Sequence, residues 1–315
     1  MINAFVSRAY MHRSICMLVV GGLLALATLT GCGTKSSTPA EKADAELLSL
    51  VSAAISSEGE SAKDAVDYGD FAFARRQLGL AADADIYDGP SSDGDAQLSS
   101  LRGTLLYASG PNSPPLVRAI DGKSIQAVAS RPVVGESAFL AVRTTQSFSE
   151  IAVALNRDGY VRRHDLLVSP RGISDVVFPV VADAGGGVVV LGGSESFVRG
   201  VLADRDTSLS RAAELISSVP GPARTAHATA SKCVLARAAG QNLSPRDGEY
   251  VLQVDGTAGE EKLSVTDRTI PTGNGEIVFG DVKAAGDTAR IEFTFSELLN
   301  PVISQLPDGV AAYDC

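Results

Sequence analysis

Tryptophan is absent from this chain of 315 residues, aromatic residues make up only 5% of it, and it has three histidines and four cysteines. A core without tryptophan must be built mainly from Ala, Val, Ile and Leu. Metal clusters and activated nucleophiles in proteins draw heavily on histidine and cysteine. Their scarcity disfavours both kinds of site before any motif is considered.

Basic residues are also in short supply. The formal net charge is −10, and it becomes two units more negative once Arg8 and Arg13 leave with the N-terminal segment described next. A protein this acidic is repelled by phosphate polyanions, so we expect no nucleic-acid partner. Anionic headgroups repel it as well, so surface charge does not explain attachment to a membrane.

The N-terminus has the three regions of a bacterial lipoprotein signal peptide. Two arginines precede an apolar stretch over residues 15–29, and the sequence Leu-Thr-Gly-Cys follows, ending at Gly31 and Cys32. This order resembles the lipobox, in which cleavage before the cysteine follows attachment of a diacylglycerol. An uncleaved membrane helix is the alternative, but the stretch is short for one and contains Gly21 and Gly22.

We therefore predict a signal peptide over residues 1–31, cleavage between Gly31 and Cys32, and lipidation of Cys32. Two acyl chains hold a protein firmly to a membrane, where one chain does not. Residues 32–42 are rich in Gly, Ser, Thr and Pro and are typical of a flexible tether. The expected location is the extracytoplasmic face of the cell membrane, with the protein anchored there by lipid.

Two cysteines, Cys233 and Cys315, remain after lipidation of Cys32 and loss of Cys16 with the signal. Outside the cytoplasm, two remaining thiols usually pair. A bond between them would stabilise the fold by about 4–5 kcal/mol in the chain-entropy model. Two independent buried thiols are the alternative.

Hydrophobic periodicity predicts helices and strands in alternation. Ser147 and Glu150 have capping-box spacing ahead of a helix, and Ser194 is a helix cap. The predicted helices are 43–56, 148–156, 195–202, 208–218 and 296–306. Residues 71–78 form a short amphipathic segment, and residues 97–107 have helical or mixed apolar character. The predicted strands are 137–142, 160–168, 176–181, 188–191, 232–238, 249–255, 276–281 and 288–295, and residues 310–313 close the chain.

This order of elements predicts an α+β protein with mostly antiparallel sheets and helices on one face. Pro220 and Pro222 interrupt the pattern at residues 219–222, which we interpret as a boundary between two sheet-containing halves. The predicted lobes are residues 43–219 and 223–315. No repeat of fixed period is present.

No motif in the chain identifies a catalytic or cofactor site. The G-x-S-x-G, S-x-x-K, C-x-x-C and H-E-x-x-H patterns are missing. His164 is predicted in a strand and His227 in a loop, and we expect both to be ordinary surface residues. Five aspartates between Asp83 and Asp95 suggest calcium, but their spacing does not fit an EF-hand, and a solvated acidic loop is the better interpretation. We expect no metal and no cofactor.

The segment over residues 137–202 carries a family resemblance. Its strand, the helix-turn FSEIAVALNRDGY and the hairpin-helix VVVLGGSESFVRGVL resemble a segment of uncharacterised exported lipoproteins of high-GC Gram-positive (actinobacterial-type) bacteria. The resemblance covers about a fifth of the chain. It implies the same location and fold and brings no activity with it.

Three function classes remain open. The first, which we favour, is a non-enzymatic binding or structural module of the cell envelope with an envelope protein or another component as partner. The second is a carrier of a lipid or other apolar ligand, which needs an apolar cavity. The third is a hydrolase whose site is assembled from dispersed residues, which needs carboxylates with perturbed pKa values in a cleft.

Overall fold

The computed structural model describes residues 44–57, 64–87, 92–105, 119–132, 137–170, 178–206, 208–229, 231–265, 268–272, 275–296 and 311–314. All of them belong to one compact unit, Ser37–Cys315. The signal peptide, the tether and the predicted helix 296–306 lie outside the described residues, apart from Ser296.

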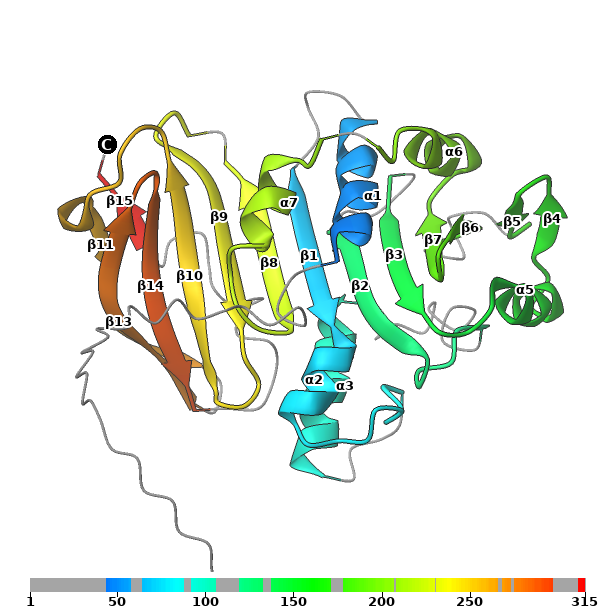
Figure 1. Cartoon of the computed structure of the whole chain (residues 1–315), viewed down its shortest axis with the longest axis horizontal. Helices are drawn as coiled ribbons and strands as arrows, with labels where there is room; N and C mark the ends of the chain where they lie inside the picture. Colours follow the sequence, from blue (N-terminus) through cyan, green and yellow to red (C-terminus); the bar gives the residue numbers. More distant parts are fainter. Residues whose placement is uncertain are drawn as a thin grey trace, which may run out of the picture. The chain divides into compact units, whose positions relative to one another are not determined.

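Most strands join one antiparallel sheet of 13 strands, in the order β12-β13-β14-β10-β9-β8-β1-β2-β3-β7-β6-β5-β4 (Figure 1). The strands in chain order are β1 Ala65–Asp70, β2 Ile125–Arg131, β3 Phe139–Thr144, β4 Val161–Arg163, β5 Leu166–Val168, β6 Val180–Gly185, β7 Val188–Gly192, β8 Ala223–Ala228, β9 Val234–Gln241, β10 Asp247–Val254, β12 Thr269–Thr272, β13 Gly275–Ala285 and β14 Thr288–Phe295. Two further strands, β11 Leu263–Val265 and β15 Ala311–Tyr313, pair with each other.

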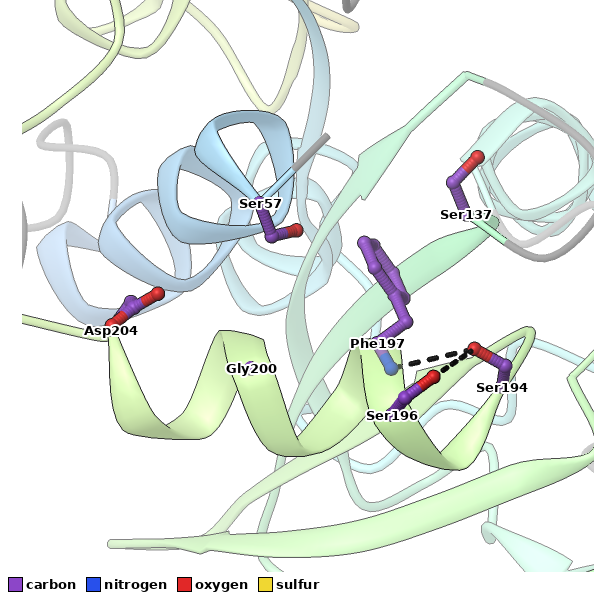
Figure 2. Close-up of a pocket in the computed structure, with 7 residues that line it drawn as sticks. All are labelled: Ser57, Ser137, Ser194, Ser196, Phe197, Gly200 and Asp204. Carbon is purple, nitrogen blue, oxygen red and sulfur yellow. Dashed lines mark hydrogen bonds between the residues drawn. The ribbon is translucent and has the colours of Figure 1, made fainter. Parts of the chain in front are cut away.

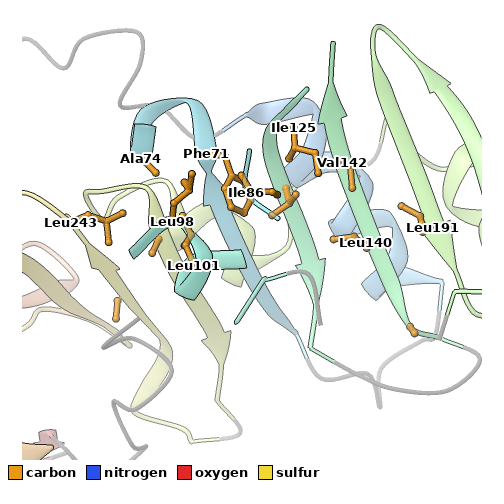
Figure 3. Close-up of a cluster of buried hydrophobic side chains, with 14 of the residues drawn as sticks. Phe71, Ala74, Ile86, Leu98, Leu101, Ile125, Leu140, Val142, Leu191 and Leu243 are labelled. Atoms are coloured by element: carbon orange, nitrogen blue, oxygen red, sulfur yellow. The ribbon is translucent and has the colours of Figure 1, made fainter. Parts of the chain in front are cut away.

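The helices lie on both faces of this sheet, so the prediction of helices on one face is wrong. α1 (Ala45–Ser56), α6 (Glu195–Ala203) and α7 (Arg211–Ile216) contribute to one apolar cluster. α2 (Phe71–Gln77), α3 (Asp93–Leu105) and α5 (Phe148–Arg157) contribute to the other, part of which Figure 3 shows. β3 explains the need for two layers, because Phe139 and Ala141 enter the first cluster while Leu140 and Val142 enter the second.

β13 and β14, which lie beyond β10 in the sheet, are covered on one face, whereas β10 still contributes Val251 to the first cluster. In β14 buried and more exposed residues alternate, and Ile291, Phe293 and Phe295 point to the same cluster as Phe279 of β13. Alternation of this kind is typical of an antiparallel sheet with one solvated face. The two ends of the sheet are protected in different ways, since β4 is short with two arginines and β12 contains Pro271.

The prediction of two sheet-containing halves is not confirmed. β1 pairs with β2 on one side and with β8 on the other, so strands from both predicted lobes continue a single sheet. The Pro-Gly-Pro segment is part of the packed seam. A Cβ on Gly221 would lie 2.0 Å from the carbonyl oxygen of Gln241, and one on Gly240 would lie 2.2 Å from that of Pro220.

Helix capping follows the sequence closely. The Ser147 hydroxyl accepts a hydrogen bond from the backbone N–H of Glu150, whose side chain accepts one from the backbone N–H of Ser147. Ser194 caps α6 by accepting from the N–H of Phe197. Among the described residues, no helix is long and apolar enough to cross a membrane.

Candidate functional site

A groove along α6 is formed by described residues. It has a volume of about 520 Å³ and is lined by Ser57, Ser137, Ser194, Ser196, Phe197, Gly200 and Asp204 (Figure 2). Three segments bring these residues together: the C-terminal end of α1, the start of β3, and the exposed face of α6. Sites for small ligands in proteins commonly have volumes of about 300–1,000 Å³.

The sequence of α6 explains its position. Residues at spacings of three and four share a helix face, so Val198 and Val201 enter the core while Ser196, Gly200 and Asp204 line the groove. α6 packs closely on β7 because Gly192 has no side chain. A Cβ on Gly192 would lie 2.5 Å from Cγ2 of Val198.

Phe197 is the large apolar side chain that lines the groove. Its ring meets that of Phe139 edge to face, with centroids 6.2 Å apart and planes at 84°. A Cβ on Gly200 would meet no atom within 4 Å, so this position opens into the groove. The Ser194 hydroxyl is used in capping α6, where it accepts a hydrogen bond from the N–H of Phe197.

A second polar site lies in the middle of the sheet. We call Ser130, Asp67, Thr225, His227 and Arg237 the central polar cluster. Asp67 of β1 stands opposite Ser130 of β2 and Thr225 of β8, and His227 stands opposite Arg237 of β9. The Thr225 hydroxyl donates to Asp67 Oδ1 at 2.6 Å.

Burial perturbs the acid of this cluster. Desolvation raises the pKa of Asp67 to about 6, although the Thr225 hydrogen bond and the nearby His227 both act to lower it. The Ser130 side chain is fully buried, and its hydroxyl has no hydrogen-bond partner among the described residues. Across the strands the order is serine, aspartate, histidine. A Ser-His-Asp triad needs the imidazole in the middle, so the cluster does not have the order of a triad.

The structure corrects the prediction for His227. It lies in β8 and is half-buried, where the sequence predicted an exposed loop. His164 is exposed as expected, but it lies in the turn between β4 and β5 with φ +60°, where the sequence predicted a continuous strand. The neighbouring Asp165 pairs with Arg199 at 2.5 Å.

The acidic loop packs against a buried cation. The guanidinium of Arg75 donates to the carbonyl oxygens of Ala84, Gly122 and Ile125 at 2.7–3.0 Å. Burial lowers the pKa of Arg75, and Asp85 and Asp83 partly offset this effect. These two carboxylates therefore compensate a buried arginine. Among the described residues, no group of three or more His, Cys, Asp or Glu side chains is placed to hold a metal ion.

Arg143 ties the N-terminal end of α1 to the sheet. Its guanidinium contacts both carboxylate oxygens of Asp44, at 2.5 and 3.0 Å, and Glu46 at 2.7 Å. A further bond runs to the carbonyl oxygen of Gly186 at 2.8 Å. The hydrogen bonds to Asp44 and Glu46 raise the pKa of Arg143. Asp44 also caps α1, so this contact fixes the first described residues of the chain.

The predicted lipidation and cleavage residues, Gly31 and Cys32, lie outside the described residues, and so does Cys315. Cys233 precedes β9 and is half-buried, and its carbonyl oxygen accepts a hydrogen bond from Asp255. Asp314, the neighbour of Cys315, donates its N–H to the carbonyl oxygen of Lys262. Pairing of Cys233 with Cys315 stays a prediction.

Comparisons with known proteins identify no family for this chain and find solved structures of low similarity. No family model matches this chain, and no curated protein matches it. Crystal form III of TP0453 is similar with a TM-score of 0.39 and 11% identity, covering 80% of this chain and 96% of that one. Crystal form I of TP0453 gives 0.38 and 12%, covering 81% and 94%. A likeness of this size carries no argument about fold or function.

Sequence reasoning found the elements of the groove but not the groove itself. The cap of α6 and the start of β3 were predicted, yet nothing in the sequence showed that the end of α1 would face α6. The central polar cluster was missed because β1, β2 and β8 were not predicted as strands. Two acidic residues and a glycine within Ala65–Asp70 are unusual for a central strand.

Proposed function

We propose that this protein is a lipid-anchored binding protein on the extracytoplasmic face of the cell membrane, and that it is not an enzyme. Its ligand occupies the groove along α6. The signal sequence and lipobox at Cys32 support the location. The groove, with its volume of about 520 Å³, is the observation that carries the binding role.

The lining of the groove favours a polar ligand over the apolar ligand of a lipid carrier. Four of its seven lining residues are serines and one is an aspartate, with Phe197 as the large apolar side chain. A hydroxyl both donates and accepts hydrogen bonds. Polar groups of a ligand can therefore exchange their bonds to water for bonds to the protein at little net cost.

Ligand binding to the folded state tests this proposal. A ligand at one hundred times its dissociation constant stabilises the folded protein by about 2.7 kcal/mol. For a domain of this size, that raises the melting temperature by about 5–10 °C. We expect such a shift from a member of a library of envelope metabolites screened against the full acylated protein in detergent.

Gly200→Leu locates the binding. Leucine would fill the open position on α6, and it is a better helix former than glycine by about 0.8 kcal/mol, so the variant should fold. Asn156→Leu adds the same side chain to an exposed position of α5 and serves as the control. A thermal shift that survives Gly200→Leu would place the ligand elsewhere and contradict the proposal.

A further inference from the structure

The polar groups of the groove have unused hydrogen-bonding capacity. Within the described part of the chain, neither the Ser137 hydroxyl nor the Asp204 carboxylate has a side-chain hydrogen bond. The Ser196 hydroxyl has one long contact, 3.4 Å, to the Ser194 hydroxyl. Ser57 donates to the carbonyl oxygen of Ala54 and can still accept.

These groups are spread along the groove. Ser196 and Asp204 are eight residues apart on one face of α6, which is about 12 Å at 1.5 Å per residue. Figure 2 shows Ser137 and Ser194 toward one end of α6, Asp204 at the other end, and Ser57 and the ring of Phe197 between them. A ligand that satisfies all of them needs several donor-acceptor groups along an extended body and an apolar face for the ring.

The charge of the protein limits which class of ligand the groove can bind. The chain has a net charge of −10, and among the described residues that line the groove the one ionisable group is the carboxylate of Asp204. An anionic ligand such as a phosphate or a carboxylate would be repelled. A neutral sugar chain has the required features, because its hydroxyls both donate and accept and its ring C–H groups pack on aromatic rings.

We infer that the groove along α6 binds a neutral oligosaccharide longer than one ring, an inference that rests on the proposed binding function. Serines 137 and 196 and the Asp204 carboxylate bond its hydroxyls, and the exposed part of the Phe197 ring packs against a sugar face. The sugar chain is either free or the headgroup of a glycolipid, and both present the same chemistry to the groove.

Isothermal titration of the full acylated protein in detergent tests this inference with maltotriose, cellotriose, chitotriose and mannotriose as probes. We expect at least one to bind. Gly200→Leu should weaken that binding at least tenfold, and Asn156→Leu should leave it unchanged. Ser196→Ala and Asp204→Asn should each weaken it by about 3–10-fold, since one hydrogen bond contributes about 0.5–1.5 kcal/mol.

A second arm identifies the source of the sugar. Digalactosyldiacylglycerol in micelles is compared with its free digalactose headgroup, and a gain of more than tenfold for the intact lipid indicates a glycolipid ligand. Equal affinity indicates a free sugar chain.

The inference is overturned if none of these sugars binds, or if binding is unaffected by Gly200→Leu. The proposed function would survive the first result if a compound without hydroxyl groups shows a thermal shift that Gly200→Leu abolishes. Both the proposed function and the inference fail if no compound shows binding that Gly200→Leu weakens.

Discussion

The Asp67→Asn substitution should make this protein more stable at neutral pH. The carboxyl of Asp67 is desolvated in the centre of the sheet, which raises its pKa from 3.8 to about 6. Between these two values the folded state keeps a proton that the unfolded state releases. The free energy of unfolding therefore falls as the pH rises through this window.

The size of the effect on the free energy of unfolding follows from the shift in the pKa of Asp67. A difference of about 2 pK units corresponds to about 3 kcal/mol, at about 1.4 kcal/mol per unit. This is the upper limit of the stability lost between about pH 4 and pH 7 through this one group. An asparagine cannot ionise, and its amide oxygen can still accept the hydrogen bond of the Thr225 hydroxyl. The variant should therefore lose this pH dependence and gain up to about 3 kcal/mol at pH 7.

Other polar side chains lie close to Asp67, and their effect on stability must be measured with separate variants. His227 and Arg237 lie on the same face of β8 and β9, and Ser130 faces it from β2. His227 is close enough to act on the charge of Asp67, so a His227→Asn variant should be measured beside Asp67→Asn. The exposed Asp281, which makes a surface ion pair with Arg268, provides the control substitution Asp281→Asn.

Urea unfolding followed by far-ultraviolet circular dichroism measures the prediction at intervals from about pH 4 to pH 8. The wild type should lose stability across the window, Asp67→Asn should not, and Asp281→Asn should follow the wild type. If Asp67→Asn is less stable than the wild type by a constant amount at every pH, the carboxylate is stabilising and the reasoning from burial is wrong.

Three further predictions concern the lipid anchor, the two cysteines and the contact between Arg143 and α1. Cys32→Ala should abolish incorporation of labelled fatty acid and move the protein from the membrane to the soluble fraction; labelling at the wild-type level would contradict the lipobox. Cys233→Ser should lower the free energy of unfolding under oxidising conditions by about 4 kcal/mol, and peptide mapping should recover Cys233 linked to Cys315 in the wild type; two free thiols would refute the pairing. Arg143→Ala should destabilise the fold by about 1–2 kcal/mol in urea unfolding, because charge-assisted bonds to two partly exposed carboxylates are lost. A change below about 0.5 kcal/mol would show that the contact does not contribute to stability.

Local signals in the sequence were sufficient for much of the secondary structure. The capping box at Ser147 and Glu150 set the start of α5, and the glycines between β6 and β7 set a hairpin. Gly185, Gly186 and Gly187 all have positive φ, a conformation that glycine adopts without steric cost. Each of these features depends on residues within a few positions of each other, so the sequence alone could predict it.

The sequence also determined properties that need no fold. Net charge, the lack of tryptophan and the scarcity of histidine come from composition. The expected lipid anchor comes from the order of a short N-terminal segment, which a processing enzyme reads before the protein folds. None of these depends on which strands pair.

The centre of the sheet was decided by tertiary structure. β1 and β8 are far apart in the chain, yet Asp67 lies opposite Thr225 and the two share a hydrogen bond. Neither strand has a strong local preference for extended structure, since one contains two aspartates and the other follows Pro-Gly-Pro. Cross-strand pairing and burial outweigh local propensity there.

The same pairing decides the candidate sites. The half-buried position of His227 and the raised pKa of Asp67 exist because β8 completes the sheet beside β1. The groove exists because α1 and α6, separated by most of the N-terminal half of the chain, pack on the same face of that sheet. A sequence pattern reports which side chains a segment will bury, whereas the identity of its neighbours depends on long-range contacts that no local pattern encodes.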